Sequence, residues 1–158
     1  MIGQATASRT DLQAAASARN AIMPRQTLIL VVASDGMTRR TTASGLQRYD
    51  YEVLSARDGD EAAALLREHG RCLGVLVTDA DVKVGAVDGL EVARIARTLN
   101  PKVNVIYTSR APHTIPANRK VSGAPLLRTP YFPQQIIGIV ANLRHGATVG
   151  SSEIDAAA

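Results

Sequence analysis

The sequence has little cysteine and few aromatic residues, and each shortage excludes a class of protein. Cys72 is the only cysteine in 158 residues, so an internal disulfide framework is excluded and a reducing compartment is expected. Aromatic residues make up 3% of the chain, whereas hydrophobic residues make up 46%. The core must therefore consist of valine, leucine, isoleucine and alanine, which suffice for one domain of this size.

Long apolar runs are also missing. No run approaches the roughly 20 residues that a transmembrane helix requires, and the N-terminus lacks the continuous apolar segment of a signal peptide. We therefore expect no membrane association and a cytoplasmic protein. The formal net charge of +4 invites comparison with nucleic-acid-binding proteins. The basic residues are scattered and are not interleaved with aromatic residues, so the sequence argues against a nucleic-acid partner.

The middle of the chain alternates between two hydrophobic patterns. Short apolar, β-branched runs predict buried strands at 27–33, 51–56, 73–78, 103–108 and 125–128. Amphipathic stretches predict helices at 36–48, 58–69, 89–99 and 133–144. The stretch 111–123 is polar and irregular, and it predicts one short helix at most. This alternation predicts an α/β fold with a five-stranded parallel sheet and helices on both faces.

Two short segments flank the predicted domain, which covers residues 27–145. Residues 1–26 are rich in alanine, serine, threonine and arginine, and they predict an N-terminal extension with a short helix. Residues 146–158 predict a flexible C-terminal tail. Neither flank has the length of a further domain, so we expect a module without an output domain.

In parallel α/β sheets, ligands bind where the strands end, so the residues just after each predicted strand are the candidates for chemistry. They are Ala33, Ser34, Asp35, Asp79, Thr108, Ser109, Arg110, Arg128 and Thr129. The glycines form no nucleotide-binding fingerprint, and the histidines share no metal-ligand spacing with Cys72. No catalytic triad can be placed, and we do not expect an enzyme.

Four local patterns, in this order, resemble the receiver domains of bacterial response regulators over roughly residues 27–145. They are the strand at 29–32 with its three-residue turn, the strand and helix start at 51–62, Val77-Thr78-Asp79 with 88–91 downstream, and Tyr107-Thr108-Ser109 followed by 127–131. The resemblance implies a flavodoxin-like receiver fold. It also implies phosphoryl transfer from a histidine kinase to one aspartate, assisted by Mg²⁺, a lysine and a hydroxyl group.

The resemblance places Asp79 at the phosphoacceptor position and Thr108 at the switch hydroxyl. The acidic pair of the family falls on Ala33 and Ser34, and its lysine falls on Thr129. None of these three side chains can neutralise a phosphoryl group or supply a charged oxygen to Mg²⁺. The resemblance therefore implies an atypical receiver in which aspartate phosphorylation is impaired or absent.

Other residues of the chain could compensate for the missing acidic pair and lysine in two ways. Asp35, Asp79 and Asp81 would form a weak Mg²⁺ site, and no other cofactor is expected. Alternatively, Arg110 or Arg128 would reach over the pocket and pair with Asp79, because a buried carboxylate without its metal is costly. Such an ion pair would hold the pocket in one conformation.

Three functions remain open from the sequence. The first is a stand-alone receiver-like module of two-component phosphorelay signalling that acts by binding a histidine kinase, a phosphotransferase or an effector. The second is a competent phosphoacceptor that serves as a shuttle or phosphate sink. The third, of another class, is a small-molecule or nucleotide binder on a flavodoxin-like sheet. Homodimerisation is a further open alternative, because receivers often pair through the face made by their fourth helix, fifth strand and fifth helix.

Overall fold

The chain forms one parallel α/β sheet. The fold is a computed structural model that describes residues 26–83 and 85–144. Its five strands are arranged in the order β2-β1-β3-β4-β5, and every neighbouring pair is parallel. This is the α/β architecture that the hydrophobic pattern predicts. The predicted N-terminal extension, except residue 26, and the predicted C-terminal tail lie outside the described residues.

The elements follow the predicted order, with small changes at their ends. The strands are β1 Leu28–Val32, β2 Glu52–Ala56, β3 Leu73–Asp79, β4 Asn104–Ser109 and β5 Leu126–Arg128. The helices are α2 Gly36–Gln47, α3 Gly59–His69, α4 Gly89–Leu99 and α5 Pro133–Arg144, and a 3₁₀ turn, η1, covers Gly70–Cys72. Strands β3 and β4 each run one residue beyond the predicted end, because Asp79 pairs with Thr108, and Ser109 pairs with Arg128 of β5.

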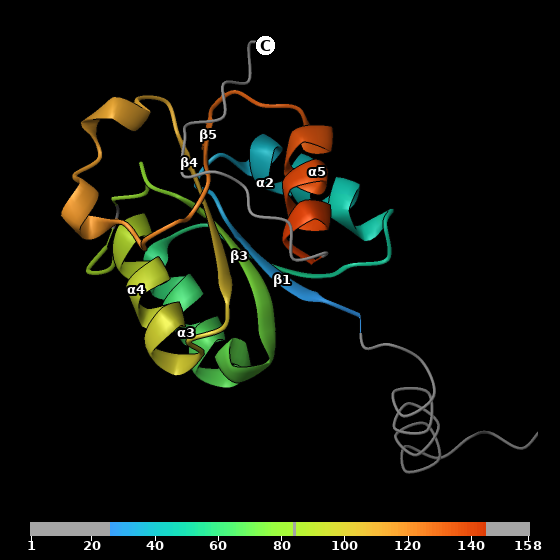
Figure 1. Ribbon diagram of the computed structural model, residues 1–158, viewed down its shortest axis with the longest axis horizontal. Helices are drawn as coiled ribbons and strands as arrows, with labels where there is room; N and C mark the ends of the chain where they lie inside the picture. The colour runs from blue at the N-terminus through green and yellow to red at the C-terminus, as the bar shows by residue number, and fades with distance from the viewer. Residues whose placement is uncertain (1–25, 84, 145–158) are drawn as a thin grey trace, which may run out of the picture.

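Helices cover both faces of the sheet (Figure 1). Helices α3 and α4 lie on one face and α2 and α5 on the other. Successive residues of a strand point to opposite faces, so β1 contributes to two separate cores. Leu30 and Val32 pack in the cluster beneath α3 and α4, while Ile29 and Val31 pack in the cluster beneath α2 and α5. The apolar runs without polar alternation are explained by this burial on both faces.

Aspartates begin three of the helices. Asp35, Asp58 and Asp88 are the N-caps of α2, α3 and α4, and each carboxylate accepts a hydrogen bond from a backbone amide of the first turn. The donors are the amides of Thr38, Glu61 and Glu91, each at 2.8 Å. Such caps satisfy amides that have no partner within the helix. They therefore place each helix start at the edge of the sheet where the strands end.

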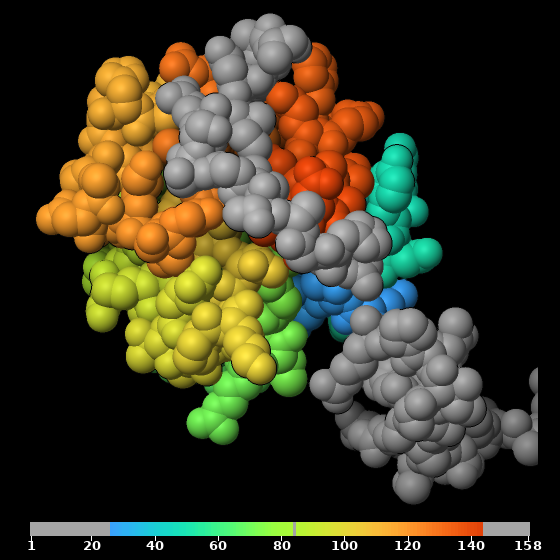
Figure 2. All heavy atoms as spheres, in the orientation of Figure 1, coloured from blue at the N-terminus to red at the C-terminus, as the bar shows by residue number. Residues whose placement is uncertain are grey.

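The connection between β4 and β5 contains no α-helix within the described residues. It is built from two 3₁₀ turns, η2 Pro112–Thr114 and η3 Ala117–Arg119, as expected from its polar, proline-containing sequence. The amide of Val121 donates to the Tyr107 hydroxyl at 2.9 Å, and Arg119 pairs with Asp88 at 2.8 Å. Figure 2 shows this orange segment beside the yellow-green surface of α4.

The described helices are short. Across residues 26–83 and 85–144, none is long and apolar enough to cross a membrane.

Candidate functional site

Strands β1, β3, β4 and β5 end at a common edge of the sheet. Val32 of β1 pairs with Thr78 of β3, and Asp79 then pairs with Thr108 of β4. Ser109, the last residue of β4, pairs with Arg128 of β5. The sheet register therefore brings together the strand ends that the sequence singled out.

Asp79 is a partly buried carboxyl group at this edge. The backbone amide of Asp81 donates to its Oδ1 at 2.9 Å. The pKa of Asp79 is raised from 3.8 to about 6, chiefly by burial and also by the negative charge of Asp81, although the hydrogen bond from the Asp81 amide and the charge of Arg110 act in the opposite direction. A desolvated carboxyl group favours its neutral form, so Asp79 titrates close to physiological pH.

The Asp81 carboxylate accepts two hydrogen bonds from the end of β4. The Ser109 hydroxyl donates to Asp81 Oδ1 at 2.8 Å, and the amide of Arg110 donates to Oδ2 at 2.8 Å. The Ser109 oxygen in turn accepts from the amide of Ala111 at 3.1 Å. Sequence reasoning assigned the switch hydroxyl to Thr108 and gave Ser109 no role. The only indication of this role in the sequence is that Ser109 directly follows Thr108.

Thr108 lies beside Asp79 in the register and is 3% exposed. The paired positions of parallel strands point to the same face, so the hydroxyl group shares its face with the Asp79 carboxyl group. No hydrogen bond of this hydroxyl to another described residue is present. Its switching role stays a prediction.

The three carboxylates of the predicted Mg²⁺ site are not gathered into one site. Asp35 is turned toward its own helix, where its Oδ2 accepts from the Thr38 amide at 2.8 Å and from the Thr38 hydroxyl at 2.6 Å. These bonds lower the pKa of Asp35, while Asp81 is bonded to the end of β4. No group of three or more acidic, histidine or cysteine residues that could hold a metal occurs in the described ranges. Capping and loop hydrogen bonds hold Asp35 and Asp81 in this structure, and the weak Mg²⁺ site stays a prediction.

The predicted ion pair between an arginine and Asp79 is also not formed. None of the ion pairs among residues 26–83 and 85–144 involves Asp79. Arg110 is exposed and lowers the pKa values of both Asp79 and Asp35 through its charge. The charge of Arg110 therefore acts on the pocket, but its side chain does not close the pocket. Arg128 is exposed at the end of β5.

A different arginine covers the end of β1. Arg39 Nη1 donates to the carbonyl oxygen of Ala33 at 2.7 Å, and Ser34 O lies 3.4 Å from the same nitrogen. Ala33 is buried and Ser34 is exposed. A cation thus lies over the turn where the resemblance implies acidic side chains. The sequence indicated nothing of this contact, because Arg39 is one of two adjacent arginines on a helix.

The turn after β5 completes the site. The amide of Thr129 donates to the Ser109 carbonyl at 2.9 Å, and the Thr129–Pro130 peptide bond is cis, although local sequence favours trans. The Tyr131 hydroxyl lies 2.8 Å from the Thr42 hydroxyl of α2. Burial raises the pKa of Tyr131, and the charge of Asp79 adds to this effect. Tyr131 therefore lies near Asp79. Its position in the sequence did not indicate this proximity.

Comparison with solved structures gives this arrangement its family context. A response regulator receiver protein from Sinorhizobium medicae WSM419 superposes with a TM-score of 0.69 at 25% identity, covering 78% of this chain and 98% of that chain. A receiver domain protein from Clostridium thermocellum gives 0.64 at 21% identity, covering 76% and 95%. The chain has the receiver fold.

Other comparisons agree or find no match. The receiver domain of the hybrid histidine kinase CckA superposes with a TM-score of 0.61 at 24% identity, covering 73% of this chain and 96% of that domain. No family model matches the sequence, and no curated protein matches it either. The similarity to receivers is therefore clearest in the tertiary structure.

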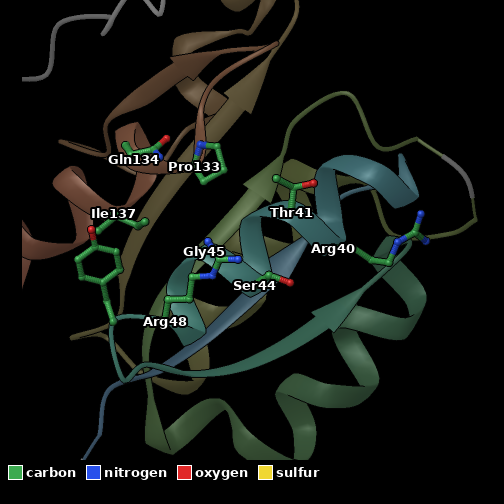
Figure 3. A pocket seen from close by; sticks show the side chains of 9 residues that line it. Arg40, Thr41, Ser44, Gly45, Arg48, Pro133, Gln134 and Ile137 are labelled. Carbon is green, nitrogen blue, oxygen red and sulfur yellow. The ribbon is translucent and has the colours of Figure 1, made fainter.

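A groove opens on the receiver fold between α2 and α5 (Figure 3). It has a volume of about 590 Å³ and is lined by residues of both helices. Arg40, Ser44 and Arg48 line the α2 side, and Pro133 and Ile137 line the α5 side. In Figure 3 the Arg40 side chain points away from α5. Exposed apolar side chains lie on the same two elements and the turns beside them. They are Met37, Tyr49 and Phe132, which are 67%, 60% and 71% exposed.

Proposed function

We propose that this chain is an atypical receiver module of two-component phosphorelay signalling that acts by protein–protein interaction, with phosphorylation of Asp79 impaired or absent. The proposal depends on one observation: the Asp79 carboxyl group lies at the strand edge, and the described part of the chain gathers no set of acidic metal ligands around it. Phosphoryl transfer to a carboxylate needs a cation to neutralise the phosphoryl oxygens.

The neighbouring positions support the same proposal. Ala33 and Ser34 offer no carboxylate, Thr129 offers no ammonium group, and Arg39 places positive charge over the end of β1. A cation there disfavours the approach of Mg²⁺. Asp81, the nearest second acid, already accepts two hydrogen bonds. These contacts orient the Asp81 carboxylate toward the end of β4.

The proposed partner is a signalling protein, a histidine kinase, phosphotransferase or effector, that presents an acidic surface to the α2–α5 groove. Helix α2 contains no acidic residue, while Arg40 and Arg48 line the groove. Exposed tyrosine, methionine and phenylalanine with arginine are the residue types enriched at protein interfaces. The groove therefore combines apolar area with positive charge.

The direct test is addition of beryllofluoride with Mg²⁺, observed by NMR, and of acetyl phosphate, observed by intact mass. We expect neither spectral shifts at Asp79 and Thr108 nor a gain of mass. The matched control is the double variant Ser34→Asp with Thr129→Lys, which rebuilds an acid and the lysine. We expect this variant to respond to beryllofluoride. A response of the unmodified protein at ordinary Mg²⁺ concentrations, lost in Asp79→Asn, would show instead a competent shuttle or phosphate sink.

The partner surface has its own test. Tagged wild-type protein should retain an identified kinase, phosphotransferase or effector, and the variant Arg40→Glu with Arg48→Glu should lose it. The control reverses two exposed arginines outside the groove, Arg67 and Arg71, and should retain the partner. Equal retention by both variants would reject the α2–α5 groove. A bound metabolite or nucleotide in place of a protein would support the third function, a small-molecule binder.

A further inference from the structure

A second groove lies on the other side of the molecule, between α4 and the connection that follows η3. Its volume is about 390 Å³, and its walls include Arg94 and Arg97 of α4 together with Arg119 and Lys120. The groove is present because 3₁₀ turns, and not an α-helix, connect β4 to β5. It shares no lining residue with the α2–α5 groove.

Two of the four cations are already neutralised. Arg94 forms a bidentate pair with Glu91, and Arg119 pairs with both oxygens of Asp88 at 3.1 and 2.8 Å. These ion pairs fix the side chains of Arg94 and Arg119 at the sides of the groove. Arg97 and Lys120 form no ion pair with any residue in 26–83 or 85–144. The groove therefore carries two uncompensated positive charges.

Two buried hydrogen-bond donors next to the groove have no acceptor among the described residues. Arg97 Nε has no hydrogen-bond partner there. The Tyr107 hydroxyl belongs to a fully buried side chain outside the groove lining; it accepts from the Val121 amide at 2.9 Å, but no described acceptor takes its own proton. Arg97 and Arg119 both lower the pKa of Tyr107 against the larger effect of burial, so these charges lie close to the phenol. Buried donors without acceptors are rare because their desolvation is not compensated.

We propose that the α4–η3 groove binds a phosphate monoester, held by Arg97 and Lys120. A phosphate monoester carries close to two negative charges at neutral pH and offers only acceptor oxygens. It therefore matches the two uncompensated cations that line the groove. The planar guanidinium of Arg97 suits phosphate geometry, and Lys120 adds a mobile charge. This site is independent of Asp79 and of the function proposed above.

The test uses inorganic phosphate as the probe on the full-length chain, followed by ¹⁵N–¹H NMR at constant ionic strength against chloride. We expect saturable shifts of the amides of Arg97 and residues 118–121. Arg97→Gln and Lys120→Gln should each weaken binding by about tenfold, the value expected for loss of one charge-assisted contact. The matched controls, Arg67→Gln and Lys102→Gln, replace exposed cations outside the groove and should bind phosphate like the wild type.

Two sources of the phosphate group are separated by further titrations. Stronger saturable binding of adenosine monophosphate than of inorganic phosphate would assign the site to a small molecule, and stronger binding of a phosphoserine peptide would assign it to a modified protein. Either result supports the proposal if the Arg97→Gln variant binds the same compound more weakly than the wild type does. Shifts confined to Asp79 and Thr108, unsaturable shifts, or equal losses in the control variants would overturn it. None of these outcomes affects the beryllofluoride test.

Discussion

Asp79 shows how a single residue is changed by its surroundings. Its carboxyl group is partly desolvated, accepts one backbone hydrogen bond and has no ion-pair partner among residues 26–83 and 85–144. Desolvation therefore dominates, and the pKa rises. Asp35, on the same edge of the sheet, is exposed and accepts two hydrogen bonds from Thr38, so its pKa falls. The pKa values of two aspartates at the same edge of the sheet are thus shifted in opposite directions.

Asp79→Asn should stabilise the protein at neutral pH. The pKa of Asp79 in the folded protein is about 6, above its ordinary value of 3.8. Asp79 therefore does not lower the free energy of unfolding below pH 3.8, and it lowers this free energy by the full amount above about pH 6. A pKa difference of this size corresponds to roughly 3 kcal/mol at most, and we expect a gain of about 1–3 kcal/mol from urea unfolding near pH 7.5. The gain should vanish as the pH falls through the folded pKa toward the ordinary value.

The control for this variant is Asp35→Asn. The pKa of Asp35 is lowered, so its ionised form contributes stability that is present above the ordinary pKa and lost as the pH falls through the folded pKa. We expect Asp35→Asn to give no gain at neutral pH. Equal gains from both variants would show that removal of net charge, and not the burial of Asp79, is responsible.

Arg110→Ala should change the titration of Asp79 more than the stability of the protein. Arg110 lowers the pKa of Asp79 without pairing with it, so its removal should raise that pKa further. Because the side chain is exposed, the free energy of unfolding should change by less than about 0.5 kcal/mol. Carboxyl ¹³C NMR and urea unfolding measure the two effects. A large loss of stability with Arg110→Ala would restore the predicted ion pair.

At the scale of elements, the start of α4 is packed directly on the end of β3. A Cβ at Gly89 would lie 1.9 Å from the Asp79 carbonyl oxygen, which real contacts do not allow. The Thr78 hydroxyl also donates to the Gly89 carbonyl at 2.9 Å. The helix start and the strand end therefore form one unit, and any shift of α4 displaces the backbone of Asp79.

Gly89→Ala should destabilise the protein by about 2–4 kcal/mol, because the backbone must move to accept the methyl group. Gly138→Ala is the matched control in α5, where a Cβ would meet nothing within 4 Å. That change should stabilise the protein by roughly 0.5–1 kcal/mol through helix propensity. Urea unfolding of the two variants measures both values. A Gly89→Ala protein as stable as the wild type would show that the β3–α4 junction is not tight.

At the scale of the molecule, the receiver fold has one edge for chemistry and two grooves for ligands. The Asp79 pocket lies where the strands end, the α2–α5 groove lies on one side (Figure 3), and the α4–η3 groove lies on the other. The two hydrophobic clusters on the faces of the sheet are separate. Ligands at the two grooves therefore contact different layers of the molecule.

A protein limited to residues 26–144 should fold by itself. The two hydrophobic clusters and the five strands seen among the described residues are formed within that range. We expect its free energy of unfolding to lie within about 1 kcal/mol of the full-length value, since removing the terminal residues of a domain usually costs little. Parallel urea titrations measure the difference. A chain that fails to fold, or that loses several kcal/mol, would show that the flanking segments belong to the domain.

The sequence by itself determined the sheet, the helices and the place of Asp79 at a strand end. Burial on both faces leaves apolar runs such as residues 28–32, and amphipathic helices such as α4 have their own period, so both are visible without coordinates. Only the tertiary structure decided the partners of the polar groups: Asp35 bonds to Thr38, Asp81 to Ser109, and Arg39 to the carbonyl oxygen of Ala33. A hydrogen bond depends on loop geometry to within a fraction of an ångström, and residue type and spacing do not encode that geometry.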